Sequence, residues 1–285
     1  MLAPMFANLS AGALGLPLDH PTAIDLAVRH DFGGVDPDPT YFAGLGSVQA
    51  VSEHAAAVRE RGLSWGIAGL PVPLDGPAET FRAALVDLPA TLELLRAAGV
   101  TALGTWVRPM HEELRYRENW RLHLSRLSVV AELLADAGLR LGLEYIGPKT
   151  FWSTERFPFI HSLREARELI AESGASNVGV ILDSYHWYTA GESAEDLAGL
   201  TDADIVSVDI NDARTDRSRD EQQDLDRRLP FDTGVIDLDG FTAAVREAGY
   251  TGPVKVEPFM PSLAKEPVDD VLADVSHRLA RAISA

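Results

Sequence analysis

Four acidic residues each end a short apolar run in the second half of the chain. The runs read LGLE, VILD, SVD and VKVE, and they end in Glu144, Asp183, Asp209 and Glu257. Carboxylates are the preferred ligands of hard divalent cations, and a pair of them can also act as general acid and base. One acid at a strand end commonly caps the next helix, but four on one rim would repel each other unless protonated or bound to a cation. The pattern therefore predicts a clustered functional site that holds a divalent metal ion.

His186 follows Asp183 by three residues in the segment LDSYHWY. A lone histidine beside aromatic residues is more often a structural residue held by hydrogen bonds. Here it follows a candidate metal ligand on the same rim, and this favours a functional role. It could contact either a substrate oxygen or a metal-bound water.

Two long loops accompany these residues. Residues 211–235 carry five arginines and show no clear helix, and residues 146–160 hold Lys149, Phe151 and Trp152. Loops of this length in a compact domain are typical of lids or binding loops, and their aromatic and polar groups suit a sugar-like ligand. Most of the arginines are expected to pair with the acidic residues beside them. We assign Trp106, Lys149, Arg214 and Arg219, together with His186, to substrate binding.

A repeated phrase indicates the elements that position these residues. An amphipathic helix, a glycine and a short apolar run recur around Gly33, Gly62, Gly99, Gly138, Gly174 and Gly249. Glycine just past a helix is a common left-handed stop, and a continuous apolar run is typical of a strand buried on both faces. The last interval has room for two units, and the run 204–212 supplies the additional strand.

Counting the strands gives eight. They are expected at residues 3–9, 34–38, 64–70, 102–108, 140–145, 177–183, 204–209 and 253–258. Strict alternation with helices predicts a parallel sheet, and eight units favour closure into a (β/α)8 barrel. No GxGxxG follows a strand, which argues against an open dinucleotide-binding sheet. We predict one α/β barrel domain over residues 1–285, with its active site at the C-terminal strand ends.

The composition limits the classes of partner. The chain has 285 residues, and 43 acidic residues against 25 basic ones give a net charge of −18. This net charge disfavours binding to nucleic acid. It suits a small or neutral substrate, or it serves only solubility. Without cysteine, neither a disulfide nor a thiolate metal site can form. The apolar start lacks a basic region and no run is long enough to cross a membrane, so we expect a soluble cytoplasmic protein.

These motifs resemble the xylose isomerase-like TIM-barrel superfamily of sugar isomerases, epimerases and inosose dehydratases. The resemblance covers essentially the whole chain and is strongest in RLGLEYIGP, GVILDSYHWYTAG, VSVDINDA, RRLPFDTGVIDLDGF and GPVKVEPF. It implies a Mn, Mg, Co or Zn ion held by residues of strands five to eight, with the two glutamates as acid and base. Glu144, Asp183 and Glu257 match that pattern. A homodimer is also an expectation from the resemblance.

Two positions depart from the family pattern. Asp209 stands where the family usually has histidine, and Phe231 replaces a glycine in the LPGxG-like segment. A carboxylate in place of imidazole makes an all-oxygen site, which is expected to favour Mg or Mn over Zn. The bulky Phe231 is expected to reshape the loop and the substrate pocket.

Lys255 precedes Glu257 by two residues, so both side chains should point into the barrel. Gly142, Ile181, Ser207 and Lys255 would then form the layer below the ligands. The ammonium could reach up and partly neutralise Asp209, or its long stem could carry it to the solvated bottom of the barrel. Both alternatives remain open from the sequence.

The reaction that we predict is metal-assisted proton transfer next to the carbonyl of a sugar or polyol-derived ketone, through an enediolate. Isomerase, epimerase and dehydratase outcomes all start from that intermediate, and no phosphate cradle is evident. An AP-endonuclease function is rejected because its trinuclear zinc site needs more histidines than these strand ends supply. A non-catalytic sugar-binding barrel with a degenerate metal site is the alternative of a different class.

Overall fold

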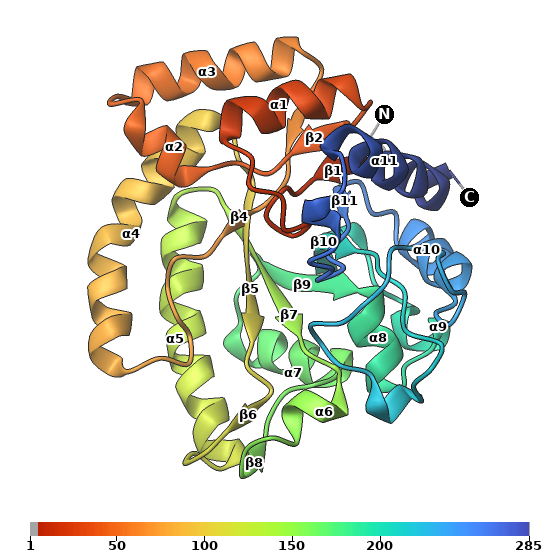
Figure 1. Ribbon diagram of the computed structural model, residues 1–285. Helices are drawn as coiled ribbons and strands as arrows, with labels where there is room; N and C mark the ends of the chain where they lie inside the picture. The colour runs from red at the N-terminus through yellow and green to blue at the C-terminus, as the bar shows by residue number, and fades with distance from the viewer. Residues whose placement is uncertain (1–4, 285) are drawn as a thin grey trace.

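The computed structural model describes residues 5–284, in which the strands form a parallel barrel surrounded by helices (Figure 1). The order of the nine-stranded sheet is β3-β2-β1-β11-β10-β9-β7-β5-β4. The first and last strands of this order, β3 and β4, are two halves of one segment, interrupted at Gly66 and Ile67. The two edges of the sheet therefore meet, and the barrel closes. This confirms the predicted fold.

Each of the eight predicted strands contains an observed strand. The observed bounds are β1 (Phe6–Leu9), β2 (Gly34–Val35), β3 (Ser64–Trp65), β4 (Ala68–Gly69), β5 (Ala102–Val107), β7 (Arg140–Tyr145), β9 (Val178–Asp183), β10 (Ile205–Asp209) and β11 (Pro253–Lys255). The third predicted strand is the one that is split in two. The start of the first prediction, residues 3 and 4, lies outside the described residues.

The helices form the outer layer, and the last of them packs against the first strand (Figure 1). Their bounds are α1 (His20–Arg29), α2 (Pro39–Gly44), α3 (Val48–Glu60), α4 (Ala78–Ala98), α5 (Tyr116–Asp136), α6 (Lys149–Trp152), α7 (Leu163–Ser173), α8 (Ser184–Ala190), α9 (Ala194–Leu197), α10 (Leu238–Glu247) and α11 (Val268–Ser284). The apolar faces of these helices and the barrel strands make one continuous hydrophobic core. Within the described residues, no helix has the length and apolar character needed to cross a membrane.

The predicted glycine stops are confirmed at five of six positions. Gly62, Gly99, Gly138, Gly174 and Gly249 all have positive φ. The sixth prediction, at Gly33, is wrong, because the left-handed residue after α1 is Asp31, with φ of 58°. Aspartate tolerates this conformation better than most non-glycine residues.

The loops contain short elements that the sequence pattern did not predict. Met110–His111 (β6) pairs antiparallel with Phe157–Pro158 (β8), beside the short helix α6. In the loop after β10, a 3-10 turn spans Arg219–Glu221 (η2), and an isolated bridge joins Asp212 to Arg228. The buried Asp212 carboxylate also accepts hydrogen bonds from the N–H groups of Thr233, Gly234 and Ile236. These contacts fix the loop over the C-terminal ends of the strands.

Candidate active site

The barrel brings the four predicted acidic residues together. Glu144 lies on β7, Asp183 ends β9, Asp209 ends β10, and Glu257 follows β11 by two residues. One carboxylate oxygen from each side chain lies within 4.8 Å of those of the other three. The parallel register places Asp209 directly beside Asp183 on one side and Lys255 on the other. The closed sheet thus gathers at one rim residues that are more than one hundred positions apart in sequence.

Asp183 is held from three directions. Its side chain is fully buried, and its Oδ1 accepts a 2.7 Å hydrogen bond from the N–H of Tyr185 at the start of α8. The amide of Asn211 donates to both carboxylate oxygens, at 3.2 and 3.3 Å. Arg227 Nη1 donates to Oδ2 at 2.6 Å. These bonds fix the orientation of this candidate ligand.

Arg227 is a central residue of the site that our site assignment omitted. It is the largest fully buried side chain, and it also donates to Asp224 Oδ1 at 2.8 Å and to the carbonyls of Asp224 and Glu257. Its guanidinium lies between the rings of Tyr185 and Phe259, at 4.9 and 4.7 Å from their centroids. The nearby carboxylates outweigh the effect of burial and raise the pKa of Arg227. The RRLP segment was the available signal, but its local acidic neighbours indicated only surface pairing.

Lys255 resolves the alternative that the sequence left open. Its Nζ lies 2.9 Å from Asp209 Oδ2 and 3.8 Å from Glu257 Oε1, and its side chain is 14% exposed. The ammonium therefore neutralises Asp209, and the interpretation that it reaches the barrel bottom is wrong. The register pairs Lys255 with Asp209 on the neighbouring strand.

The electrostatics of the cluster follow from burial and like charge. Burial, followed by the charges of Glu257 and Asp209, raises the pKa of Glu144 well above its usual value. Burial raises the pKa of Asp209 to about 7, although Lys255 opposes the shift. Burial disfavours the ammonium of Lys255, but the surrounding carboxylates outweigh that effect and raise its pKa. The cluster therefore carries more negative charge than its own lysine and arginine can stabilise.

His186 is a fully buried, neutral member of the site. Burial and the neighbouring Arg227 lower the pKa of His186 to about 3. The N–H of Gly147 donates to His186 Nδ1 at 3.3 Å, and Arg227 Nη2, which is also a donor, lies 3.2 Å from Nε2. That nitrogen lies 3.6 Å from Glu144 Oε1, too far for a hydrogen bond. Both ring nitrogens thus face donors of the protein, which hold the ring in place beside Glu144.

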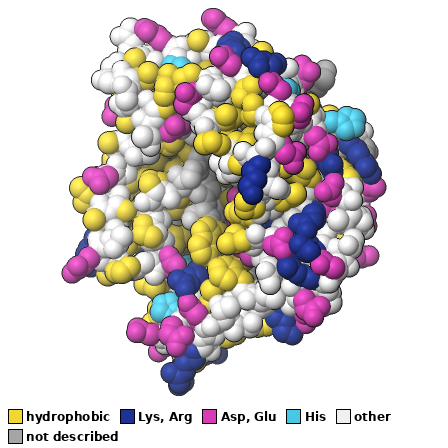
Figure 2. All heavy atoms as spheres, viewed as in Figure 1, with side chains coloured by type: hydrophobic (Ala, Val, Ile, Leu, Met, Phe, Trp, Pro, Cys, Tyr) yellow, Lys and Arg dark blue, Asp and Glu magenta, His cyan; other side chains and the backbone are white. Residues whose placement is uncertain are grey.

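A cavity of about 670 Å³ opens beside the acidic cluster. Glu144, His186, Asp224, Arg227 and Glu257 form its polar wall. Its other walls are mostly apolar and are lined by Trp106, Ile146, Phe151, Leu225 and Phe259, with Thr150 and Gln223. In Figure 2 the corresponding view of the molecule is hollowed near its centre, with hydrophobic side chains around the hollow. The cavity thus combines a charged wall with a largely apolar surround.

The residues assigned to substrate binding divide into two groups. Trp106 and His186 line the cavity, and Trp106 is 48% exposed. Lys149 pairs with Asp220 at 2.8 Å, and Arg214 pairs with Asp216 and Asp226. Arg219 is half-exposed, and its Nε lies 4.0 Å from Asp220 Oδ1. The structure therefore places these three cations outside the residues that line the cavity, in the pairing expected for most loop arginines.

Phe231 has a positive φ of 64°, in the left-handed region that favours glycine. The guanidinium of Arg281 lies 3.8 Å from the centroid of its ring. Phe231 does not line the cavity, whereas Phe259, with φ of 47°, does. The residue that shapes the cavity wall is therefore Phe259.

The donor set fits a divalent cation. Two buried oxygens of the cluster, Glu144 Oε1 and Asp209 Oδ1, have no hydrogen-bond partner within residues 5–284. The four carboxylates carry four negative charges if ionised, and Lys255 and Arg227 compensate two of them. A divalent ion would balance the remaining charge and supply partners for both oxygens.

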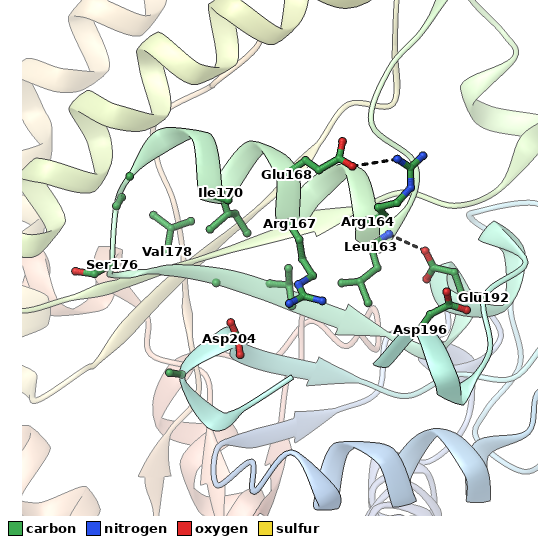
Figure 3. Close-up of a pocket in the computed structure, with 16 residues that line it drawn as sticks. Leu163, Arg164, Arg167, Glu168, Ile170, Ser176, Val178, Glu192, Asp196 and Asp204 are labelled. Atoms are coloured by element: carbon green, nitrogen blue, oxygen red, sulfur yellow. Dashed lines mark hydrogen bonds and ion pairs between the residues drawn. The ribbon is translucent and has the colours of Figure 1, made fainter. Parts of the chain in front are cut away.

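A larger hollow, of about 820 Å³, lies on the outer flank of the barrel between α7 and β9 (Figure 3). Some of its charged groups are engaged locally. Arg164 pairs with Glu168 at 3.0 Å, and Glu192 accepts a 2.7 Å hydrogen bond from the N–H of Leu163. None of the predicted site residues lines this hollow. The chemistry of the chain is therefore concentrated in the smaller cavity.

Residues 24–280 match the family described as xylose isomerase-like TIM barrel. An inosose isomerase of Halalkalibacterium halodurans is 24% identical over 181 residues, 64% of this chain and 61% of that protein. The inosose isomerase of Bacillus subtilis is 29% identical over 52% of this chain and 49% of its own length. A 3-dehydroshikimate dehydratase of Pseudomonas aeruginosa is 29% identical over 47% of this chain and 20% of its own length. The matches thus span about half to three-fifths of the inosose isomerases.

Solved structures extend the likeness to the whole fold. A xylose isomerase domain protein from Alicyclobacillus acidocaldarius has a TM-score of 0.87 and 30% identity, with 98% of each chain covered. The IolI protein with a bound zinc atom has a TM-score of 0.81 at 18% identity, again over 98% of each chain. D-psicose 3-epimerase has a TM-score of 0.70 at 14% identity, over 99% of this chain and 98% of its own.

Proposed function

The chain belongs to the xylose isomerase-like TIM-barrel family, and on that premise we propose that it catalyses a divalent-metal-dependent isomerisation or epimerisation of a sugar or polyol-derived ketone. One observation carries the proposal. Glu144 and Glu257 belong to the acidic cluster and also line the cavity, so a small molecule can meet both carboxylates at once. The related inosose isomerases and the structurally similar D-psicose 3-epimerase support a substrate of this class.

The residues fit a simple proton transfer. Glu144, Asp183, Asp209 and Glu257 would hold the cation, which polarises the substrate carbonyl when bound. One glutamate removes the proton from the carbon next to the carbonyl, and the carbonyl becomes part of an enediolate. The other glutamate donates a proton, either to the opposite face of the same carbon or to the former carbonyl carbon, and in the second case the proton of the adjacent hydroxyl moves to the former carbonyl oxygen. The first outcome is an epimerisation, and the second is an isomerisation.

The neighbouring residues position the substrate and the acids. His186 is a neutral part of the cavity wall, because burial and Arg227 lower the pKa of its ring. Arg227 fixes Asp183 and closes one side of the cavity with its stacked guanidinium. Trp106 and Phe151, whose ring centroids are 6.3 Å apart, offer an apolar surface to the C–H face of a sugar.

The charges favour a substrate without phosphate or carboxylate. Among the described residues that line the cavity, Arg227 is the only cation, and its N–H groups are directed at Asp183, Asp224, two carbonyls and His186. Lys255 is engaged by Asp209. An anionic substrate group in the cavity would therefore lie near the carboxylates of Glu144, Asp224 and Glu257, and the cavity-lining residues described by the structure would offer it no free cation. A neutral keto-sugar or keto-polyol does not carry this penalty.

The oxygen-only donor set of the four carboxylates favours Mg²⁺ or Mn²⁺ over Zn²⁺ in this proposal. The IolI structure holds a zinc atom, so the test must compare Zn²⁺ with Mg²⁺ and Mn²⁺.

The proposal is tested first by metal content. The protein is purified without chelator, its bound metals are quantified, and thermal melting is measured with Mn²⁺, Mg²⁺ and Zn²⁺. About one equivalent of metal is expected, with loss of the ion in Glu144→Gln and Glu257→Gln. Glu79→Gln, which changes an exposed glutamate in the first turn of α4, serves as the matched control. Neutral keto-sugars and keto-polyols are then screened by NMR in deuterated water, where exchange at the carbon next to the carbonyl reports the proton transfer.

The outcomes separate the candidate functions. Deuterium exchange with a rearranged product supports an isomerase or epimerase, whereas release of water identifies a dehydratase, as in the 3-dehydroshikimate dehydratase relative. Binding of keto-sugars with neither metal nor exchange would overturn the proposal in favour of a sugar-binding barrel. The Lys255–Asp209 ion pair is the feature that favours this second candidate.

A further inference from the structure

Lys255 supplies a positive charge at the side of the cluster where Asp209 lies. Its Nζ is 2.9 Å from Asp209 Oδ2 and 3.8 Å from Glu257 Oε1. The other oxygen of Asp209, Oδ1, is buried and has no hydrogen-bond partner in the part of the chain that the structure describes. One oxygen of this side chain is therefore bound by the protein's own cation, and the second remains for another partner.

Lys255 does not act on the substrate directly. The residues that line the cavity include Glu257 but not Lys255. The backbone register places Lys255 beside Asp209, behind the face that Glu144 and Glu257 present to the cavity. Any influence of the ammonium on the chemistry must therefore pass through the carboxylates that it contacts.

We propose that Lys255 is a positioning residue that competes with a divalent cation for Asp209. It stabilises the four-carboxylate cluster before the cation arrives, and it lowers the affinity of the site for that cation. The inference rests on the proposed metal site. Its physical basis is that an ammonium bound to Asp209 Oδ2 leaves only Oδ1 to the ion and also repels the ion's charge.

The reason for such a residue is the excess of carboxylates. Asp209 is 1% exposed and Asp183 is fully buried, and two buried carboxylates in register on neighbouring strands destabilise each other. Asp183 has Arg227, whereas Asp209 has Lys255. Each buried aspartate of the cluster thus has its own cation. Loss of the second cation should weaken the metal-free fold and leave a more strongly negative site.

The test is Lys255→Met, which keeps an unbranched apolar side chain and removes the charge. Calorimetry with Mn²⁺ is expected to show a dissociation constant at least about tenfold lower than that of the wild type, since a positive charge next to the ion has been removed. Melting of the chelator-treated variant is expected at a lower temperature than that of the wild type. Lys265→Met, at an exposed lysine in the loop after β11, is the control and should change neither quantity.

A purely structural lysine would lower the melting temperature without tightening Mn²⁺ binding, and that result would overturn the inference. Asp209→Asn and the double variant Asp209→Asn/Lys255→Met provide a second route if the single variant folds poorly. Removal of the lysine should tighten Mn²⁺ binding less in the Asp209→Asn background, because the contested carboxylate is gone. An equal effect in both backgrounds would contradict competition for Asp209. If neither wild type nor variant binds Mn²⁺, Mg²⁺ or Zn²⁺, the metal site itself is wrong and the inference falls with it.

Discussion

Arg227 Nη1 lies 2.6 Å from Asp183 Oδ2, and both side chains are almost completely buried. The pair joins the end of β9 to the loop after β10, so it connects the acidic cluster to the wall of the cavity. A buried ion pair adds little net stability compared with apolar packing, but removal of one partner leaves an uncompensated charge. Arg227 is therefore needed to compensate the buried charge of Asp183.

We expect Arg227→Met to lower the free energy of unfolding by about 3 kcal/mol, because it leaves Asp183 buried without its cation. Urea denaturation of the metal-free protein measures the loss. Mn²⁺ should restore part of it, since the ion can replace the missing positive charge at Asp183. Arg228→Met is the matched control, because Arg228 pairs with the partly exposed Asp226 and should cost less than about 1 kcal/mol. Equal effects of the two substitutions would show that burial of the Arg227 pair does not matter.

Gly147 sets the approach of the loop after β7 to α8. A Cβ at this position would lie 2.3 Å from the carbonyl oxygen of His186 and 2.6 Å from Thr189 Oγ1. Gly147→Ala should therefore push α8 away, at a cost of about 2 kcal/mol, and weaken the hydrogen bond to His186 Nδ1. Chemical denaturation checks the first effect, and the nitrogen chemical shifts of the His186 ring check the second. Gly12→Ala meets no atom within 4 Å and should have little effect. A stable Gly147→Ala variant with unchanged shifts would contradict the argument.

The sequence predicted the barrel because its information is local and repeated. Apolar runs after glycine stops mark buried strands, and the count of eight implies closure. The grouping of Glu144, Asp183, Asp209 and Glu257 followed from this, since the fold alone brings the C-terminal strand ends to one rim. The prediction at Gly33 was wrong because the stop lies two residues earlier, at Asp31, and a non-glycine residue carries the positive φ.

The partners of long polar side chains could not be predicted from sequence. Arg227 and Arg228 are adjacent and have acidic residues nearby, yet one is buried against Asp183 and the other pairs near the surface. This difference depends on how residues 211–235 fold over the barrel. Hydrogen bonds to Asp212 fix that path, and no periodic sequence pattern predicts such bonds. The direction of Lys255 likewise depended on the register of β11 with β10.

A histidine cluster at the start of α1 predicts a loss of stability in acid. His20 is 6% exposed, and its ring lies against Tyr41, Trp65 and His54 at centroid distances of 4.8 to 5.7 Å. Burial, followed by the charge of His54, lowers the pKa of His20 to about 4. The unfolded chain therefore binds more protons between pH 6.5 and 4, and the folded state loses stability as the pH falls through this window.

We expect His20→Phe to reduce that loss by on the order of 2 kcal/mol between pH 7 and 4, because the aromatic packing remains without a group to protonate. Denaturant titrations at several pH values measure the slope. His277→Phe, on the exposed face of α11, should leave the slope unchanged. If the His20→Phe slope equals that of the wild type, the neutral buried histidine is not the source of acid sensitivity.

Glu192 predicts the opposite dependence at higher pH. Its carboxylate accepts a 2.6 Å hydrogen bond from the hydroxyl of Tyr145, the neighbour of Glu144 on β7, and another from the N–H of Leu163. Burial raises the pKa of Glu192 to about 7, although both hydrogen bonds oppose the shift. The folded state therefore binds more protons than the unfolded chain between pH 4.5 and 7, and stability is lost as the pH rises through that range.

Glu192→Gln should remove this loss, because a neutral amide occupies the same space and the Tyr145 hydroxyl can accept a hydrogen bond from it. The expected result is a variant whose free energy of unfolding, relative to the wild type, improves by on the order of 2 kcal/mol between pH 5 and 8. Glu195→Gln, at an exposed residue of α9, is the matched control and should follow the wild type. Parallel curves for wild type and Glu192→Gln over this range would mean that Glu192 is already ionised at pH 5 and that its hydrogen bonds outweigh its burial.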